Sequence, residues 1–285
     1  MDLCNINEIK ALLARHGFHF SKAKGQNFLT QSWVPQNIVL ESGVDETCGV
    51  LEVGPGIGPL TQQLCRYAKK VVAVEVDRTL QPILAETMAG NENLEIIFGD
   101  ILKTDISALV QEEFAGLRPM ACANLPYYIT SPIIMLLLES RLPVDSITVM
   151  VQKEAAQRLC AEVGSRDSGA ITVGVNYYGT VRKLFDVSRG SFMPSPNVDS
   201  AVIRIDLNHE PRLDGASEKF FFSMVKAGFS QRRKTLANAI SSQLKMEKTA
   251  VYAVLSALGI SESVRIEALT MEELIAVSRG LMSAK

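Results

Sequence analysis

Short apolar runs alternate with stretches of helical periodicity along the first two thirds of the chain. Five of these runs have the length and composition of buried strands, at 50–53, 71–76, 94–98, 120–123 and 147–151. Two later runs, 173–178 and 201–207, alternate like partly exposed strands. A helical segment at 34–42 precedes the first strand, and others lie between the early strands, as at 80–88. This repeat predicts an α/β fold with a parallel, doubly wound sheet.

The pattern changes near residue 208, where a polar stretch with turn residues is typical of a linker. Only helical periodicity follows, at about 218–229, 232–244, 247–258 and 271–282. We therefore expect a larger domain over 1–207, with an N-terminal helix and cap segment over 1–45, and a small all-helical domain over 208–285. The second domain is too small and too helical to carry chemistry, so the site is expected in the first.

Polar groups or glycines follow four of the predicted strands. The first strand runs into Gly54-Pro55-Gly56-Ile57-Gly58, the second closes on Glu75, and the third ends at Asp100. The fourth is followed by Asn124-Leu125-Pro126-Tyr127-Tyr128. Each feature alone has a structural explanation, as a turn, a surface strand end or a helix cap. Ligands bind at the carboxyl ends of parallel strands, so their coincidence favours a site for an adenosine-containing ligand.

The formal net charge of −2 is unevenly distributed along the chain. Residues 1–207 hold 18 basic and 23 acidic side chains, a balance of −5, whereas residues 208–285 hold 11 and 8, a balance of +3. No acidic residue occurs from 219 to 246. A basic segment on an acidic protein suggests a polyanion partner, although charge alone favours an ordinary solvated helix face.

The cysteines and the hydropathy of the chain indicate the cellular compartment in which the protein is expected to work. The five cysteines are scattered and never form a Cys-x-x-Cys pair, which favours reduced thiols in a cytosolic protein and argues against a zinc site. The longest apolar run, 133–138, is far too short to cross a membrane, and no secretory signal is recognised. We therefore expect a cytoplasmic protein with no metal and no membrane association.

The four strand ends together resemble those of the Rossmann-like, S-adenosylmethionine-dependent methyltransferases. With Asn124-Leu125-Pro126-Tyr127 on the fourth strand, the chain looks like the branch that methylates exocyclic amines of nucleobases. Further segments are similar to the rRNA adenine N6,N6-dimethyltransferase family, most of all to its bacterial small-subunit branch. These segments are 25–29, 50–56, 124–130, 151–154, 192–200 and 232–238.

The resemblance implies S-adenosylmethionine as cofactor, S-adenosylhomocysteine as product, and a specific set of cofactor contacts. Asn27 and Leu29 would close the pocket from the N-terminal side. Gly54 would lie against the methionine moiety, Glu75 on the ribose and Asp100 on the adenine. Asn124 would sit between the cofactor and the target base.

The same resemblance implies how the base is handled. The Asn124 side chain and the backbone carbonyl of Leu125, held by Pro126, would accept hydrogen bonds from an adenine amino group and aim its lone pair at the methyl group. Tyr127 and Phe192 would hold the base from either side. Tyr128 is expected to be core.

The implied substrate is a pair of adjacent adenines near the 3′ end of small-subunit rRNA, within a 30S-like particle. The RNA contacts would come from basic residues at both ends of the chain, with the protein as a monomer. These residues are Lys22, Lys24, Lys226, Arg232, Arg233 and Lys234. Lys24 and Ser168 depart from the family pattern and bear on details of RNA contact.

Three alternatives remain open from the sequence. A resistance-type methyltransferase acting on large-subunit rRNA would be expected to be strongly basic, and this chain is not. A non-catalytic ribosome-assembly factor would not need the Asn-Leu-Pro-Tyr motif or the carboxylates at the strand ends. A nicotinamide-dependent oxidoreductase is disfavoured because the glycines follow G-x-G-x-G and not G-x-G-x-x-G.

Overall fold

The computed structural model describes residues 1–21, 25–140 and 144–284, which divide into two compact units. The first unit comprises Met1–Ala156 and Val181–Leu207, and the second comprises Gln157–Thr180 and Asn208–Lys285. The division at 207/208 is where the sequence placed it, but 157–180 belongs to the helical unit and not, as expected from the sequence, to the first domain. None of the helices in the described part of the chain is long and apolar enough to cross a membrane.

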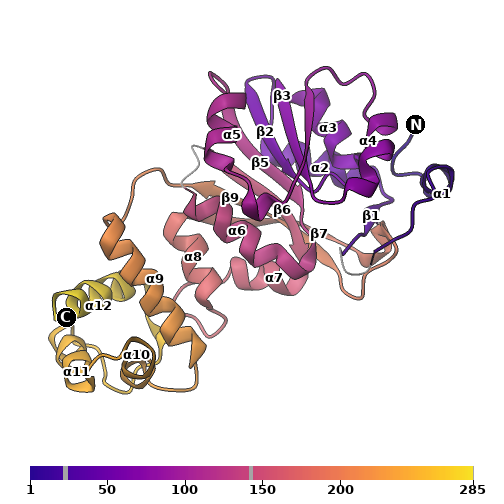
Figure 1. Cartoon of the computed structure of the whole chain (residues 1–285). Coiled ribbons are helices and arrows are strands. Elements are labelled where there is room, and N and C mark those ends of the chain that lie inside the picture. The colour runs from indigo at the N-terminus through magenta and orange to yellow at the C-terminus, as the bar shows by residue number, and fades with distance from the viewer. Residues whose placement is uncertain (22–24, 141–143, 285) are drawn as a thin grey trace. The chain divides into compact units, whose positions relative to one another are not determined.

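A seven-stranded sheet forms the centre of the first unit, in the order β4-β3-β2-β5-β6-β9-β7 (Figure 1). Its strands are β2 (Cys48–Val53), β3 (Lys70–Glu75), β4 (Leu94–Phe98), β5 (Arg118–Asn124), β6 (Ser146–Gln152), β7 (Gly179–Val187) and β9 (Ser200–Leu207). The first five are mutually parallel, as predicted, but β9 runs antiparallel to β6. The sheet is thus mixed and not wholly parallel.

Helices cover both faces of the sheet because the side chains of each buried strand alternate between the faces. The helices of this unit are α1 (Ile6–Arg15), α2 (Trp33–Ser42), α3 (Pro59–Tyr67), α4 (Gln81–Thr87), α5 (Ile106–Glu113) and α6 (Thr130–Glu139), with the start of α7 (Lys153–Leu159). On one face, Val50 and Met120 pack in a core cluster with α2 and α3. On the other, a side chain at Gly49 would collide with Phe114, which ends α5.

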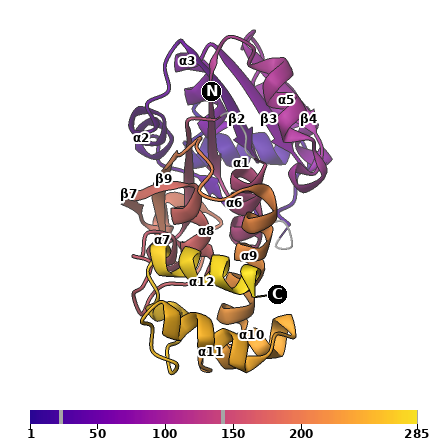
Figure 2. The same ribbon diagram turned by 90° about the vertical axis from the view of Figure 1, so that its left-hand side faces the viewer.

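The second unit is built from helices that share one apolar core. They are α8 (Ala170–Tyr178), α9 (Gly215–Ser230), α10 (Leu236–Leu244), α11 (Lys248–Ala257) and α12 (Met271–Ser283), and Figure 2 shows α9 to α12 gathered together. The strand predicted over 173–178 is wrong, because this segment is helix α8. Its buried residues Val173 and Tyr177 are four positions apart, so they share one helix face and enter the core beside Phe221.

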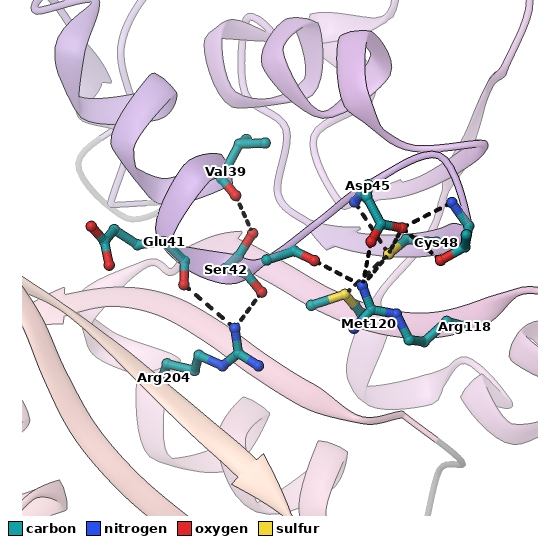
Figure 3. Close-up of polar contacts among 10 residues, drawn as sticks. Val39, Glu41, Ser42, Asp45, Cys48, Arg118, Met120 and Arg204 are labelled. Carbon is teal, nitrogen blue, oxygen red and sulfur yellow. Dashed lines mark hydrogen bonds and ion pairs between the residues drawn. The ribbon is translucent and has the colours of Figure 1, made fainter.

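Two arginines hold the C-terminus of α2 at the end of the sheet where β2 begins (Figure 3). Arg204 of β9 donates to the carbonyl oxygens of Ser42 and Glu41, at 2.5 Å and 3.4 Å. Arg118 of β5 donates to the carbonyl of Gly43 at 2.8 Å. The last carbonyls of a helix lack partners within the helix and carry partial negative charge, so these guanidinium groups stabilise the junction of α2 with the sheet.

Candidate active site

A cavity of about 290 Å³ lies at the carboxyl ends of β2, β3, β4 and β5. Because these four strands are parallel neighbours, their ends meet at one edge of the sheet. The cavity is lined from 25–29, 52–56, 59–60, 74–77, 99–102 and 124–129, together with Leu80 and Ile133. All these segments belong to the first unit.

The turn between β2 and α3 needs glycine for its backbone shape. Gly54, Gly56 and Gly58 adopt φ values of 72°, 62° and 98°, a region that side chains disfavour. A Cβ at Gly54 would meet no protein atom within 4 Å, whereas one at Gly58 would lie 2.5 Å from the Met88 side chain. Gly54 thus leaves open space beside the cavity, and Gly58 allows the close approach of α4.

Glu75, at the end of β3, is only 5% exposed and is held by backbone amides. Its Oε2 accepts from the N–H of Gly56 at 3.2 Å and its Oε1 from the N–H of Asp77 at 2.8 Å. Burial raises the pKa of this carboxyl group. Each oxygen keeps a further lone pair, so Glu75 can also accept from hydroxyl groups of a ligand.

Glu52, on β2, is a second buried carboxyl group in the cavity wall and was not singled out from the sequence as a site residue. It is 1% exposed, and its Oε2 has no hydrogen-bond partner within the described residues. Burial, with the nearby Glu75, raises its pKa to about 8. A buried polar atom without a partner is costly, so this oxygen is a candidate acceptor or donor for a ligand.

Asp100 lies beyond β4 and is half-buried at the cavity wall. It caps a short 3₁₀ helix, Ile101–Lys103, since its Oδ1 accepts from the N–H of Leu102 at 3.0 Å. Its Oδ2 lies 3.8 Å from the Lys103 ammonium. Asp100 is therefore a helix cap through its Oδ1, as one reading of the sequence suggested, and the residue also lines the cavity.

The segment before α2 closes one side of the cavity. Gln26 donates from Nε2 to Asp77 at 2.6 Å and accepts from the N–H of Ser21 at 2.9 Å. The Asn27 amide donates to the carbonyl of Gly25 at 3.1 Å. Gln26 and Asp77 were not predicted as site residues, because a link between residues 51 positions apart leaves no sequence pattern.

Leu29 and Phe192 belong to a two-stranded ribbon outside the main sheet. Strand β1 (Phe28–Leu29) pairs antiparallel with β8 (Phe192–Met193), and Leu29 lies opposite Phe192. Phe192 is 5% exposed, packs in the same core cluster as α2, and is not among the described residues that line the cavity. The role of its ring as a second wall for the target base stays a prediction, and in the ribbon the residue lies opposite Leu29.

Asn124 ends β5 opposite Met150 of β6. The next residue, Leu125, is anchored by its N–H, which donates to the carbonyl of Met150 at 3.1 Å. Neither the Asn124 side chain nor the Leu125 carbonyl oxygen is engaged in a hydrogen bond by another residue of the described chain. Two acceptors thus stand side by side at the cavity, on backbone fixed by the sheet and by Pro126.

The two tyrosines of the motif have different surroundings. Tyr127 lines the cavity, and its hydroxyl forms a 2.6 Å hydrogen bond with the hydroxyl of Ser200. Burial raises the pKa of the Tyr127 hydroxyl. The expectation that Tyr128 is core is wrong, because it is 57% exposed and lines the cavity near Gly25.

Four of the basic residues assigned to RNA can be placed, and none of the four lines this cavity. Lys22 and Lys24 lie outside the described residues. Lys226, Arg232, Arg233 and Lys234 are all exposed in the second unit, and Arg232 donates to the carbonyl of Arg166. Ser168 is buried in the same unit, with no described partner for its hydroxyl.

Comparison with known proteins agrees with this geometry. The sequence profile of the ribosomal RNA adenine dimethylase family matches residues 17–281. The chain belongs to this family. It is 46% identical over 285 residues to a ribosomal RNA small subunit methyltransferase A from Geobacillus thermodenitrificans, covering 99% of this chain and 97% of that protein. A protein of the same description from Alkaliphilus oremlandii is 46% identical, covering 93% of this chain and 92% of its own.

Solved structures of similar proteins share the fold. A dimethyladenosine transferase from Plasmodium falciparum superposes with a TM-score of 0.72 at 27% identity, covering 87% of this chain and 95% of the other. The 23S rRNA methyltransferase ErmE superposes with a TM-score of 0.66 at 26% identity, covering 90% and 100%. The fold is therefore that of a Rossmann-like methyltransferase with an added helical unit, as predicted.

Membership of this family implies S-adenosylmethionine as cofactor, and the donor set of the cavity fits it. The carboxylate oxygens of Glu75 would accept from ribose hydroxyls, and a carboxylate oxygen of Asp100 would accept from an adenine amino group. The open space at Gly54, and the Glu52 oxygen that has no hydrogen-bond partner among the described residues, suit a polar tail. Among the described residues, no group of three or more His, Cys, Asp or Glu side chains is arranged to hold a metal ion.

Proposed function

We propose that the protein transfers two methyl groups from S-adenosylmethionine to the N6 amino group of each of two adjacent adenines near the 3′ end of small-subunit rRNA. The pair of unengaged acceptors at Asn124 and Leu125, in a cavity that suits the cofactor, carries the chemical part of this proposal. The full-length similarity to small subunit methyltransferases supports the substrate.

The acceptors at Asn124 and Leu125 address the main difficulty of the reaction. The lone pair of an adenine amino nitrogen is delocalised into the ring, so the nitrogen is a poor nucleophile. If Asn124 Oδ1 and the Leu125 carbonyl accept its two hydrogens, the nitrogen becomes more pyramidal and its lone pair points along one direction. When bound, S-adenosylmethionine supplies an electrophilic methyl group on a sulfonium leaving group. Positioning by the protein is therefore the main source of rate, and no strong base is needed before attack. The methylated nitrogen is positively charged and acidic, and it then releases one proton to solvent for each methyl group transferred.

Tyr127 is placed to hold the target base. Its ring lines the cavity next to Asn124, and its hydroxyl is fixed by Ser200. Stacking on an aromatic ring is worth about 1–3 kcal/mol per base, which offsets the few kcal/mol needed to unstack the adenine. Tyr128, which is 57% exposed at the same cavity, offers a second aromatic surface beside Tyr127.

The helical unit carries the basic residues for RNA binding in this proposal. The exposed Lys226, Arg232, Arg233 and Lys234 supply phosphate contacts from the helical unit, and the protein acts as a monomer in the cytoplasm on a 30S-like particle. Such contacts bind the shape and charge of RNA more than its sequence.

The test is methyl transfer from labelled cofactor to small-subunit particles that lack the modification. Wild type should label two adjacent adenines near the 3′ end, and Asn124→Ala should lose most of the activity while still binding cofactor. Asn7→Ala, an exposed asparagine on α1, is the matched control and should behave as wild type. Failure of wild type to label small-subunit adenines would refute the proposal, and full activity of Asn124→Ala would refute the role of that residue.

A second candidate is methylation of large-subunit rRNA, favoured by the structural similarity to ErmE. Parallel reactions with naked large-subunit rRNA and with small-subunit particles separate the two. Labelling confined to the large-subunit RNA would decide for this alternative.

A further inference from the structure

A second, polar hollow of about 390 Å³ lies in the first unit, next to the carboxyl end of β6. It is lined by Gln152, Lys153, Glu154, Arg189, Asn197, Val198 and Asp199. None of these residues lines the cavity described above, and none has been given a role in methyl transfer. The hollow is therefore lined by a separate set of residues of the same unit.

One hydrogen bond joins the walls of the two spaces. Tyr127 lines the reaction cavity, and its hydroxyl bonds to Ser200 at 2.6 Å. Ser200 lies opposite Gln152 in the β6–β9 register and directly follows Asp199, and both neighbours line the hollow. Strand β6 is also the strand beside Asn124, because Asn124 of β5 lies opposite Met150, two residues before Gln152.

The loop that forms the outer wall is held in place by its own hydrogen bonds. Asp199 Oδ1 accepts from the N–H of Arg189 at 2.9 Å, and the Asp199 carbonyl accepts from the N–H of Lys153 at 3.0 Å. The Arg189 guanidinium donates to the carbonyl of Asn197 at 3.4 Å, and Ser195 Oγ donates to the carbonyl of Arg189 at 2.9 Å. The hollow is thus a formed part of the fold, made from β6, the start of α7 and the segment before β9.

The lining suits a nucleotide more than a bare phosphate. The Gln152 and Asn197 amides, which carry both donors and acceptors, make no side-chain hydrogen bond within the described part of the chain. Lys153 and Arg189 supply positive charge, with Lys153 also 3.5 Å from Asp186. Glu154 and Asp199 add carboxylates, which repel a phosphate but accept from base amino groups. Amides and carboxylates for a base edge, with cations for its phosphate, are the usual elements of base recognition.

We infer that this hollow binds the nucleotide next to the target adenine, with Asn197 and Gln152 at its base and Lys153 and Arg189 at its phosphate. The inference rests on the proposed function, since it assigns a subsite to that substrate. It makes the hollow a determinant of which adenine enters the cavity, because a nucleotide seated beside Ser200 sets the register of the strand at Tyr127.

The test uses small-subunit particles in which the nucleotide on the 5′ or on the 3′ side of a target adenine lacks its base. Wild type is compared with the double variant Lys153→Ala/Asn197→Ala. Lys183→Ala is the matched control, because Lys183 also pairs with Asp186, at 3.2 Å, but does not line the hollow. The measured quantities are kcat/KM for methyl transfer and the Kd of cofactor by calorimetry.

On one of the two abasic particles, kcat/KM of wild type and of Lys183→Ala should be about tenfold lower than on the intact particle. This is the loss expected when the free energy of one base contact is removed. The double variant should have a lowered kcat/KM on the intact particle, and on the abasic particle its kcat/KM should fall by less than about a further twofold. Its Kd for cofactor should equal that of wild type. Equal sensitivity of the double variant and wild type, or no effect of either missing base on wild type, would overturn the inference. Absence of methylation of intact particles by wild type would instead count against the proposed function.

Discussion

Gln26 and Asp77, 51 residues apart in sequence, are joined by a 2.6 Å hydrogen bond at the wall of the cavity. This bond ties the segment before α2 to the loop after β3, across the space that the cofactor would fill. Gln26→Ala should therefore loosen the closing segment and raise the KM for S-adenosylmethionine by about tenfold, as expected for a hydrogen bond to a charged group. Steady-state kinetics with varied cofactor measures this change.

Gln111→Ala is the matched control for that variant, because Gln111 is exposed on α5 and lines no part of the cavity. Its KM should equal that of wild type. An unchanged KM in Gln26→Ala would show that the bond does not hold the cavity closed.

The buried Glu52 predicts a pH dependence of stability. Its pKa is raised from 4.5 to about 8, so between these values the folded protein retains a proton that the unfolded chain releases. The stabilising contribution is complete below the unfolded value and is lost as the pH rises towards 8. Glu52→Gln cannot ionise, so its stability relative to wild type should increase over this window by up to about 1.4 kcal/mol per pH unit.

Denaturant unfolding between about pH 5 and pH 9 measures that difference. The exposed Glu46→Gln, in the loop before β2, should follow the wild-type curve throughout. A constant offset between Glu52→Gln and wild type across the range would mean that Glu52 ionises normally in the folded protein.

Arg204 should stabilise the fold through the C-terminus of α2 (Figure 3). Its side chain is 17% exposed and donates to the Ser42 carbonyl, so Arg204→Met should lower the free energy of unfolding by about 1–3 kcal/mol. Arg204 also pairs with Asp206, at 2.7 Å. Arg182→Met is a close control, because Arg182 lies 3.8 Å from the same carboxylate but is 55% exposed. Its effect should stay within about 0.5 kcal/mol, and an equal loss in both variants would assign the effect to Asp206.

The exposed Arg233 and Lys234 of the helical unit should contribute to particle binding through charge. Arg233→Ala/Lys234→Ala should weaken binding to small-subunit particles and reduce the slope of log K against log salt by about 1–2, one counterion per lost phosphate contact. Cofactor affinity should not change. Lys248→Ala, an exposed residue at the start of α11, serves as control; the same slope in all three proteins would remove these residues from the RNA interface.

The strand ends were predictable because their signals are local. Gly54, Glu75, Asp100 and Asn124 each follow an apolar run, and parallel order alone brings such positions to one edge of a sheet. The structure does place them around one cavity, together with Asn27 and Leu29. Their individual contacts with cofactor and base stay predictions from the family resemblance.

The predictions that the structure contradicts concern segments whose secondary structure or burial is set by tertiary contacts and not by sequence periodicity. The segment 173–178 is a helix because Val173 and Tyr177 meet the core of the second unit, which draws 157–180 into that unit. Strand β7 was missed since an edge strand with exposed Arg182 and Lys183 lacks a strong apolar pattern. Tyr128, which was expected to be core, is exposed at the cavity because its neighbours leave it uncovered.

The sequence by itself determined the α/β repeat, the helical C-terminal part, the glycine turn and the four strand ends, because these depend on residues close together in the chain. Only the tertiary structure decided which side chains share the cavity, such as Gln26 with Asp77, and that Glu52 Oε2 is buried with no hydrogen-bond partner among the described residues. It also decided that Tyr127 reaches Ser200 and so links the cavity to a second hollow. Such relations depend on the register between strands and on the closure of distant segments, which no local pattern encodes.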